Sequence, residues 1–135
     1  MKMLCNKSVL IVDDDARMLR ALNKVLTGEG ASVNQALWAG DALDYLNSRR
    51  TPVDLVITDL RLPFVSGLTA VYAIHNIFPE LPIIVLTAFG SPDVKDECLR
   101  LGAATVMEKP LNTAELLEVI ERVFAANQTS LAPAN

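Results

Sequence analysis

The feature that most constrains the fold of this chain is a regular alternation between short apolar runs and longer segments with helical spacing. The strand-like runs occupy residues 8–12, 31–36, 53–58, 82–86 and 104–107, of which 31–36 is the weaker, more polar one. Each is followed by a segment whose apolar residues recur every three or four positions, which is typical of one face of a helix. Strands that alternate with helices in this way form a parallel sheet with helices on both faces. The sequence therefore predicts an α/β domain.

Several of the expected helices also carry start and stop signals. Ser91 followed by Pro92 is typical of a helix N-cap and first helical residue. Gly102 is expected to end that helix, because glycine readily adopts the backbone conformation of a helix stop. Asn112, with Glu115 three residues later, resembles a capping box that opens the last helix. These signals support the same alternation of elements.

Size and composition favour one cytoplasmic domain. The chain has 135 residues, which is the usual size of a single domain, and 51% of them are hydrophobic. Its formal net charge is −4, no Lys/Arg cluster appears in the sequence, and no apolar run approaches the length of a membrane span. We therefore expect that this chain neither binds nucleic acid directly nor associates with a membrane. Cys5 and Cys98 lack CxxC partners and are expected to be reduced thiols.

Polar side chains follow four of the five expected strands. Asp13, Asp14 and Asp15 follow the first strand, and Asp59 follows the third. Thr87 and Lys109 follow the fourth and fifth strands. In parallel sheets of this kind ligands bind beyond the carboxyl ends of the strands, so these side chains are expected to meet at one edge.

The types of these residues suit phosphoryl transfer. Clustered carboxylates repel one another, so without a metal the site is expected to be strained or partly protonated. Mg²⁺ relieves that repulsion, because it binds one or two carboxylates together with waters and phosphate oxygens. A lysine ammonium and a threonine hydroxyl can bind phosphoryl oxygens, and a carboxylate can act as the nucleophile and become an aspartyl phosphate.

Four motifs, each at a strand end, strongly resemble the receiver domain of bacterial two-component response regulators. They are Val9-Leu10-Ile11-Val12-Asp13-Asp14-Asp15, Val56-Ile57-Thr58-Asp59-Leu60-Arg61-Leu62-Pro63 with Gly67, Val85-Leu86-Thr87-Ala88, and Glu108-Lys109-Pro110-Leu111. The resemblance implies a doubly wound five-stranded parallel sheet flanked by five helices, with the flavodoxin-like strand order 2-1-3-4-5. It assigns residues 7–126 to the receiver domain and residues 127–135 to a C-terminal tail or the start of a linker.

The resemblance implies a role for each polar residue at the acidic end of the site. Asp59 accepts a phosphoryl group from the phosphohistidine of a sensor histidine kinase or phosphotransfer protein. Asp14 binds Mg²⁺ (or Mn²⁺) directly, Asp13 acts largely through water, and the backbone carbonyl of Arg61 completes the metal shell. Asp15 is a helix cap.

The other two residues connect the site with an output surface. Thr87 and Lys109 are implied to bind phosphoryl oxygens and to couple the modification to the face built by the fourth helix, the fifth strand and the fifth helix. The bond between Lys109 and Pro110 is usually cis in this family. The family often has Tyr or Phe three residues before the lysine, but here that position is Val106, so the usual coupling through an aromatic ring is not expected.

The resemblance implies a phosphoacceptor signalling domain rather than an enzyme, one that assists its own phosphorylation and dephosphorylation. Two rival functions are weighed against it. Asp13 and Asp15 superficially match the Asp-x-Asp motif of haloacid-dehalogenase-type phosphatases, but Ala16 and Arg17 follow the motif, no later strand ends in an acidic pair, and the sequence shows no cap domain or substrate-sized insertion. Val106 slightly favours an interaction module that works without phosphorylation, while the intact set of polar residues at the strand ends argues against it.

The acidic cluster leads to three expectations. Mg²⁺ should stabilise the fold by mass action. Asp59→Asn should stabilise the metal-free protein, because it removes one repelling charge. Acetyl phosphate with Mg²⁺ should add one phosphoryl group at Asp59.

Homodimerisation is compatible with the resemblance, and the motif around Asp59 is similar to receivers of the nitrogen-regulator type.

Overall fold

Strands and helices alternate along the chain in the computed structural model, which describes residues 2–48, 52–61, 66–88 and 90–131, with side chains to residue 127. Within these ranges the elements are, in order, β1 (Ser8–Val12), α1 (Ala16–Gly28), β2 (Ser32–Ala36), α2 (Ala39–Ser48), β3 (Leu55–Asp59), α3 (Gly67–Ile77), β4 (Ile83–Thr87), α4 (Pro92–Arg100), β5 (Thr105–Glu108) and α5 (Thr113–Leu131). The predicted alternation is confirmed.

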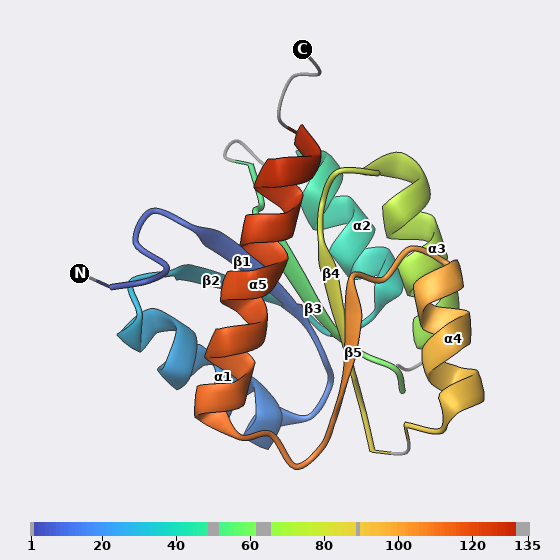
Figure 1. Ribbon diagram of the computed structural model, residues 1–135, viewed down its shortest axis with the longest axis horizontal. Coiled ribbons are helices and arrows are strands. Elements are labelled where there is room, and N and C mark those ends of the chain that lie inside the picture. The colour runs from blue at the N-terminus through green and yellow to red at the C-terminus, as the bar shows by residue number, and fades with distance from the viewer. Residues whose placement is uncertain (1, 49–51, 62–65, 89, 132–135) are drawn as a thin grey trace.

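All five strands lie in one parallel sheet with the order β2-β1-β3-β4-β5, as predicted. The register aligns Val12 of β1 with Thr58 of β3, and Thr87 of β4 with Glu108 of β5. The carboxyl ends of the strands therefore meet at one edge, which is the lower edge in Figure 1. Strand order reverses between β1 and β3, which is where sheets of this type form their ligand sites.

Each face of the sheet is covered by its own hydrophobic core. Alternate strand residues point to opposite faces, so Leu55 and Ile57 of β3 belong to one core and Val56 to the other. The first core is closed by the buried side of α1 and α5, and the second by α2, α3 and α4. This two-sided burial explains why the inner strands β1, β3 and β4 read as continuous apolar runs.

The helix signals in the sequence are confirmed with small differences in length. Ser91 caps α4 by accepting the Val94 N–H at 3.3 Å, and Asn112 accepts the Glu115 N–H at 3.0 Å. Gly102 has φ = 119°, which explains the glycine after α4. We expected residues 127–135 to form a C-terminal tail or the start of a linker. Helix α5 instead continues to Leu131. That stretch contains no residue that must break a helix before Pro133, which lies outside the described residues.

Both cysteines are free thiols, as expected. Cys98 is buried in the second core, and burial raises the pKa of its thiol. Cys5 is exposed near the N-terminus. Among the described residues, no helix has the length and apolar character to cross a membrane.

Candidate functional site

Asp59 and Lys109 form a partly buried ion pair at the carboxyl edge of the sheet. Asp59 is the last residue of β3 and is only 8% exposed. Its Oδ2 accepts a hydrogen bond from Lys109 Nζ at 2.8 Å, and its Oδ1 accepts the Arg61 N–H at 3.0 Å. The two residues are 50 positions apart in sequence. The topology therefore brings together two of the predicted site residues and fixes the orientation of the Asp59 carboxylate.

Asp13 is the most buried of the three consecutive aspartates. It follows β1, its N–H donates to the Ala36 carbonyl at 3.0 Å, and its Oδ1 accepts the Asp15 N–H at 2.9 Å. Its Oδ2 is buried and finds no hydrogen-bond partner in the described part of the chain. Burial without a partner for one oxygen penalises the charged form of a carboxyl group.

The pKa of Asp13 is raised to about 6, and burial is the largest cause. The hydrogen bond from Asp15 lowers this pKa, the charge of Asp59 raises it, and Lys109 lowers it. Repulsion from Asp59, which the clustered carboxylates lead us to expect, is therefore a smaller cause of the raised pKa than burial.

The remaining aspartates lie outside the buried pair. Asp14 is exposed at the start of the loop after β1. Asp15 is the N-cap of α1 and accepts the Arg17 N–H at 2.9 Å, which confirms its role as a cap. Among the residues the structure describes, no three His, Cys, Asp or Glu side chains are grouped closely enough to hold a metal ion by themselves.

Thr87 and Lys109 are joined at the same edge through the backbone. Thr87 is the last residue of β4 and is buried, and its carbonyl accepts the Lys109 N–H at 2.8 Å. The Lys109–Pro110 peptide bond is cis, as the family resemblance led us to expect. Val106 pairs with Val85 and packs half-buried against the second core, so it behaves as a packing residue.

Two residues that hold the backbone of Asp59 were not assigned a role from the sequence. The buried Thr58 hydroxyl donates to the Asp59 carbonyl at 3.1 Å. Gly67, the first residue of α3, donates its N–H to the Leu60 carbonyl at 2.8 Å, and a Cβ on Gly67 would overlap the Leu60 backbone. In the sequence Thr58 resembles any β-branched strand residue, so only the glycine in the motif gave a signal.

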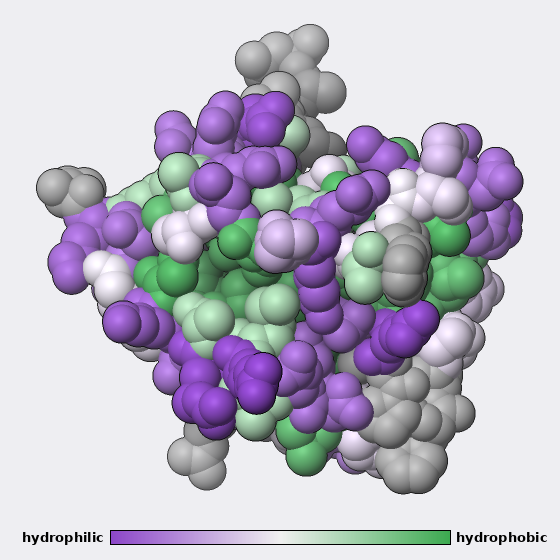
Figure 2. All heavy atoms as spheres, turned by 90° about the horizontal axis from the view of Figure 1, so that it is seen from below, coloured by the Kyte–Doolittle hydropathy of each residue, from purple (hydrophilic) through white to green (hydrophobic). Residues whose placement is uncertain are grey.

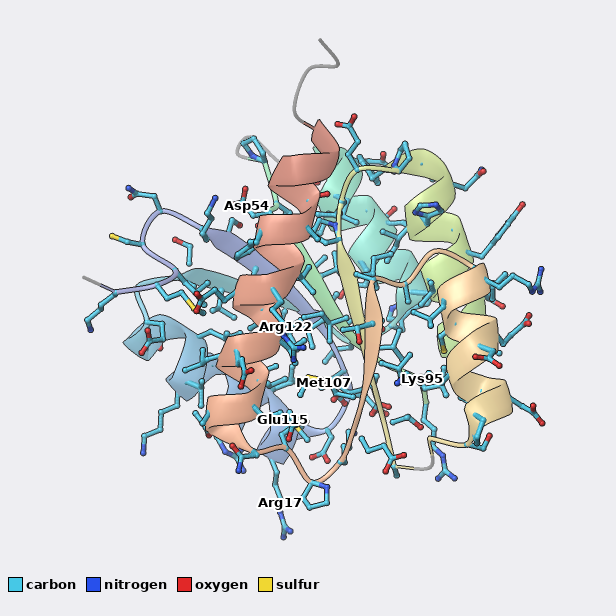
Figure 3. All side chains as sticks on the ribbon, in the orientation of Figure 1. Arg17, Asp54, Lys95, Met107, Glu115 and Arg122 are labelled. Carbon is cyan, nitrogen blue, oxygen red and sulfur yellow. The ribbon has the colours of Figure 1, made fainter. Side chains whose placement is uncertain are left out.

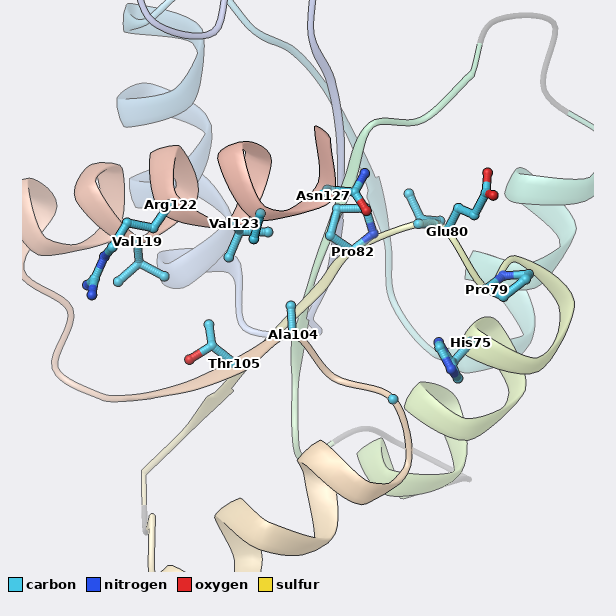
Figure 4. Close-up of a pocket in the computed structure, with 13 residues that line it drawn as sticks. His75, Pro79, Glu80, Pro82, Ala104, Thr105, Val119, Arg122, Val123 and Asn127 are labelled. Carbon is cyan, nitrogen blue, oxygen red and sulfur yellow. The ribbon is translucent and has the colours of Figure 1, made fainter. Parts of the chain in front are cut away.

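A groove of about 500 Å³ lies at the opposite, amino edge of the sheet, away from these residues. Figure 4 shows its walls, with His75 on α3 facing Val119 and Arg122 on α5 across Ala104 and Thr105 of the segment that enters β5. It contains neither Asp59 nor Lys109, so the acidic edge is the better candidate site.

Figure 2 views the molecule from that carboxyl edge, where hydrophilic side chains surround an apolar area.

Fold and site together define a class of α/β protein in which one aspartate faces one lysine at the carboxyl edge of a five-stranded parallel sheet. The profile of the response regulator receiver domain family matches residues 9–121. The chain belongs to this family.

Individual relatives are consistent with that membership. The chain is 31% identical over 119 residues to the sporulation initiation phosphotransferase F of Bacillus subtilis, covering 88% of this chain and 94% of that protein. It is 31% identical over 128 residues to the DNA-binding transcriptional regulator NtrC of Proteus hauseri, covering 95% of this chain but 27% of the relative. The chain thus spans about a quarter of the length of the transcriptional regulators NtrC and ZraR that it matches.

Solved structures give the same result. A CheY-like response regulator receiver domain protein from Methanospirillum hungatei is 29% identical, has a TM-score of 0.85, and matches 92% of this chain and 98% of its own. NtrX from Brucella abortus is 28% identical with a TM-score of 0.84, covering 91% of this chain and 28% of that one. The similarity extends over nearly the whole of this chain.

Proposed function

We propose that this domain is a phosphoacceptor of a bacterial two-component pathway. Asp59 takes a phosphoryl group from the phosphohistidine of a sensor histidine kinase or phosphotransfer protein in the cytoplasm. One carboxylate oxygen attacks phosphorus, the P–N bond to the imidazole breaks, and the imidazole nitrogen keeps the bonding pair. The observation that carries this proposal is the buried Asp59 whose oxygen lies 2.8 Å from Lys109 Nζ.

The chain's own residues account for the positioning that this transfer needs. The Arg61 N–H and the Lys109 ammonium orient the two oxygens of Asp59. Once Asp59 is modified, the Lys109 ammonium and the Thr87 hydroxyl bind phosphoryl oxygens, whose charge a nearby ammonium stabilises. The domain thereby assists its own phosphorylation and dephosphorylation without being an enzyme that acts on other molecules.

Asp13, Asp14, Asp59 and the Arg61 carbonyl are the proposed ligands of Mg²⁺, for which Mn²⁺ can substitute. The unpartnered Oδ2 of Asp13 and its burial next to Asp59 fit a hard cation that binds one or two carboxylates and keeps several waters. Exposed Asp14 borders the same loop. When bound, the cation neutralises charge on the phosphoryl oxygens.

We infer that the output is a change in the surface formed by α4, β5 and α5, where a partner or a second copy of the domain binds. The backbone link from Thr87 to Lys109 connects the site to β5. Because Val106 has no ring to reorient, this link rather than an aromatic side chain carries the coupling. The chain's similarity to part of NtrC-type proteins favours an output domain elsewhere in a longer regulator.

Incubation with acetyl phosphate and Mg²⁺ tests the proposed acceptor. We expect intact-mass spectrometry to detect one added phosphoryl group on the wild type and none on Asp59→Asn. The same adduct on Asp59→Asn would move the acceptor to another residue.

A phosphatase assay addresses the rival enzyme. Asp15 is already used as the cap of α1, which argues against an Asp13-x-Asp15 catalytic motif. We expect no sustained turnover of an aryl phosphate. Turnover that Asp13→Asn abolishes and Asp59→Asn retains would favour the phosphatase instead.

A further inference from the structure

Thr58 is a buried polar residue in a row of valines. It precedes Asp59 in β3, which runs from the end near Asp54 in Figure 3 down to the carboxyl edge. Thr58 is fully buried and pairs with Val12 of β1 and with Val85 of β4. Both valines belong to the second hydrophobic core, and strand alternation points Thr58 to the same face. Valine has the same branched shape, so packing alone does not account for a threonine here.

The Thr58 hydroxyl finds its partner in the backbone of Asp59. Burying a hydroxyl costs free energy unless it is hydrogen-bonded, and this one donates to the Asp59 carbonyl at 3.1 Å. The other end of the same peptide unit is also held, because the Leu60 N–H donates to the Leu86 carbonyl at 2.9 Å. The peptide plane that follows Asp59 is thus fixed from both sides.

The next peptide plane is held in the same way and contacts the Asp59 carboxylate. The Leu60 carbonyl accepts the Gly67 N–H at 2.8 Å, and the Arg61 N–H donates to Asp59 Oδ1 at 3.0 Å. Peptide units are planar and share a Cα atom, so a rotation of the first unit displaces the second. Of these four hydrogen bonds, the one from Thr58 has a side-chain donor. A substitution can therefore remove it and leave the main chain unchanged.

We propose that Thr58 is a positioning residue for the phosphorylation of Asp59. Its hydroxyl holds the two peptide planes that follow Asp59, and these planes hold the carboxylate in the orientation that meets the phosphoryl donor. The inference rests on the function proposed above. The Thr58 side chain is buried on the core side of β3, so it acts through the backbone and does not touch the phosphoryl group. Displacing a reacting group by about 1 Å can lower a rate about a hundredfold, so a small loosening is measurable.

A purely structural role for Thr58 makes a different prediction. The stability conferred by a core position depends mainly on buried volume, because lost methyl groups leave cavities. The proposed positioning role depends on the hydroxyl instead. Thr58→Ser keeps the hydroxyl and loses the methyl group, whereas Thr58→Val keeps the volume and loses the hydroxyl. Thr58→Ala loses both, so the three variants separate the two dependences.

We expect acetyl phosphate with Mg²⁺ to phosphorylate Thr58→Val and Thr58→Ala about tenfold more slowly than the wild type, and Thr58→Ser within about twofold of it. Stability in urea should follow the other order, with Thr58→Ser less stable than Thr58→Val. Intact-mass spectrometry over time measures the rates. The matched control is Thr27→Val in the last turn of α1, because the Thr27 hydroxyl also donates to a main-chain carbonyl, that of Asn23, at 2.6 Å. This control should be phosphorylated at the wild-type rate.

A second readout does not depend on phosphorylation. In EDTA, the Arg61 N–H should exchange with deuterium faster in Thr58→Val and Thr58→Ala than in the wild type and Thr58→Ser, because its hydrogen bond to Asp59 Oδ1 opens more often. NMR follows the signal of this amide. Thr27→Val should leave its exchange unchanged.

The outcomes separate this inference from the proposed function. No phosphorylation of Asp59 in the wild type overturns the proposed function itself. A phosphorylated wild type with equal rates in all the variants, or rates that follow stability instead of the hydroxyl, overturns the role of Thr58 alone. So does an Arg61 amide that is equally protected in every form. If Thr58→Val does not fold, the pair Thr58→Ser and Thr58→Ala decides the question, and a hydroxyl without which neither variant folds also overturns the positioning role.

Discussion

At the scale of single residues, Asp13 is the one whose environment conflicts most with its charge. Its Oδ2 is buried without a partner, whereas both oxygens of Asp59 are hydrogen-bonded. Neutralising Asp59 removes its repulsion toward Asp13 but leaves the half-buried Lys109 ammonium without its acceptor. We therefore expect Asp59→Asn to raise the free energy of unfolding of the metal-free protein by less than Asp13→Asn does.

We predict that Asp13→Asn raises the free energy of unfolding of the metal-free protein by about 1 to 3 kcal/mol at pH 7. The asparagine Oδ1 can still accept the Asp15 N–H. Urea unfolding in the presence of EDTA measures this change. A variant less stable than the wild type under these conditions would mean that the buried carboxylate is compensated in solution.

The pH dependence of this gain has a definite sign. The pKa of Asp13 is about 6 in the folded protein and about 4 in an unfolded chain, so the unfolded state loses its proton first as pH rises. The cost of burying the charge is absent below about pH 4 and complete above about pH 6. The stability difference between Asp13→Asn and the wild type should therefore shrink steadily from pH 7 to pH 4. A difference that stays constant over this range would contradict the assignment.

At the scale of elements, the approach of α3 to the end of β3 depends on Gly67. A side chain there would overlap the Leu60 backbone and displace the two neighbouring residues, Asp59 and Arg61. Gly28 in α1 offers a matched control, because nothing lies within 4 Å of the position of its Cβ.

We predict that Gly67→Ala destabilises the domain by about 1 to 3 kcal/mol, as overpacking does, and also slows phosphorylation by acetyl phosphate. Gly28→Ala should change stability by less than about 1 kcal/mol, in the stabilising direction, because alanine favours helix. Denaturant unfolding of both variants and a phosphorylation time course compare them. Similar effects of the two substitutions would refute a specific role for the contact at Gly67.

Elements also differ in how well the sequence predicts them. Continuous apolar runs locate β1, β3 and β4, because these strands are buried on both faces, whereas the largely exposed β2 gave only a weaker pattern. The final helix was harder to delimit. Residues 127–130 are polar, and helix α5 continues through them to Leu131 without any apolar periodicity to reveal it.

At the scale of the whole molecule, the two hydrophobic cores hold the strand ends together at one edge of the sheet. We predict that Mg²⁺ raises the melting temperature by mass action, by a free energy equal to RT ln(1 + [Mg²⁺]/Kd). The rise should follow the Mg²⁺ concentration and disappear in Asp13→Asn. Thermal unfolding in EDTA and across a Mg²⁺ series, with KCl at equal ionic strength as the control, measures it. No dependence on Mg²⁺ would count against the proposed metal site.

The sequence alone determined the order of the elements and the positions of Asp13, Asp59, Thr87 and Lys109 at strand ends, because hydrophobic period and strand boundaries are local properties of a chain. Only the tertiary structure decided that Asp59 pairs with Lys109, that Asp13 is buried while Asp14 is exposed, and that Thr58 and Gly67 hold the acceptor's backbone. Those facts depend on strand order and on the depth to which each side chain is covered. Both are set by contacts between residues far apart in sequence, which no local pattern encodes.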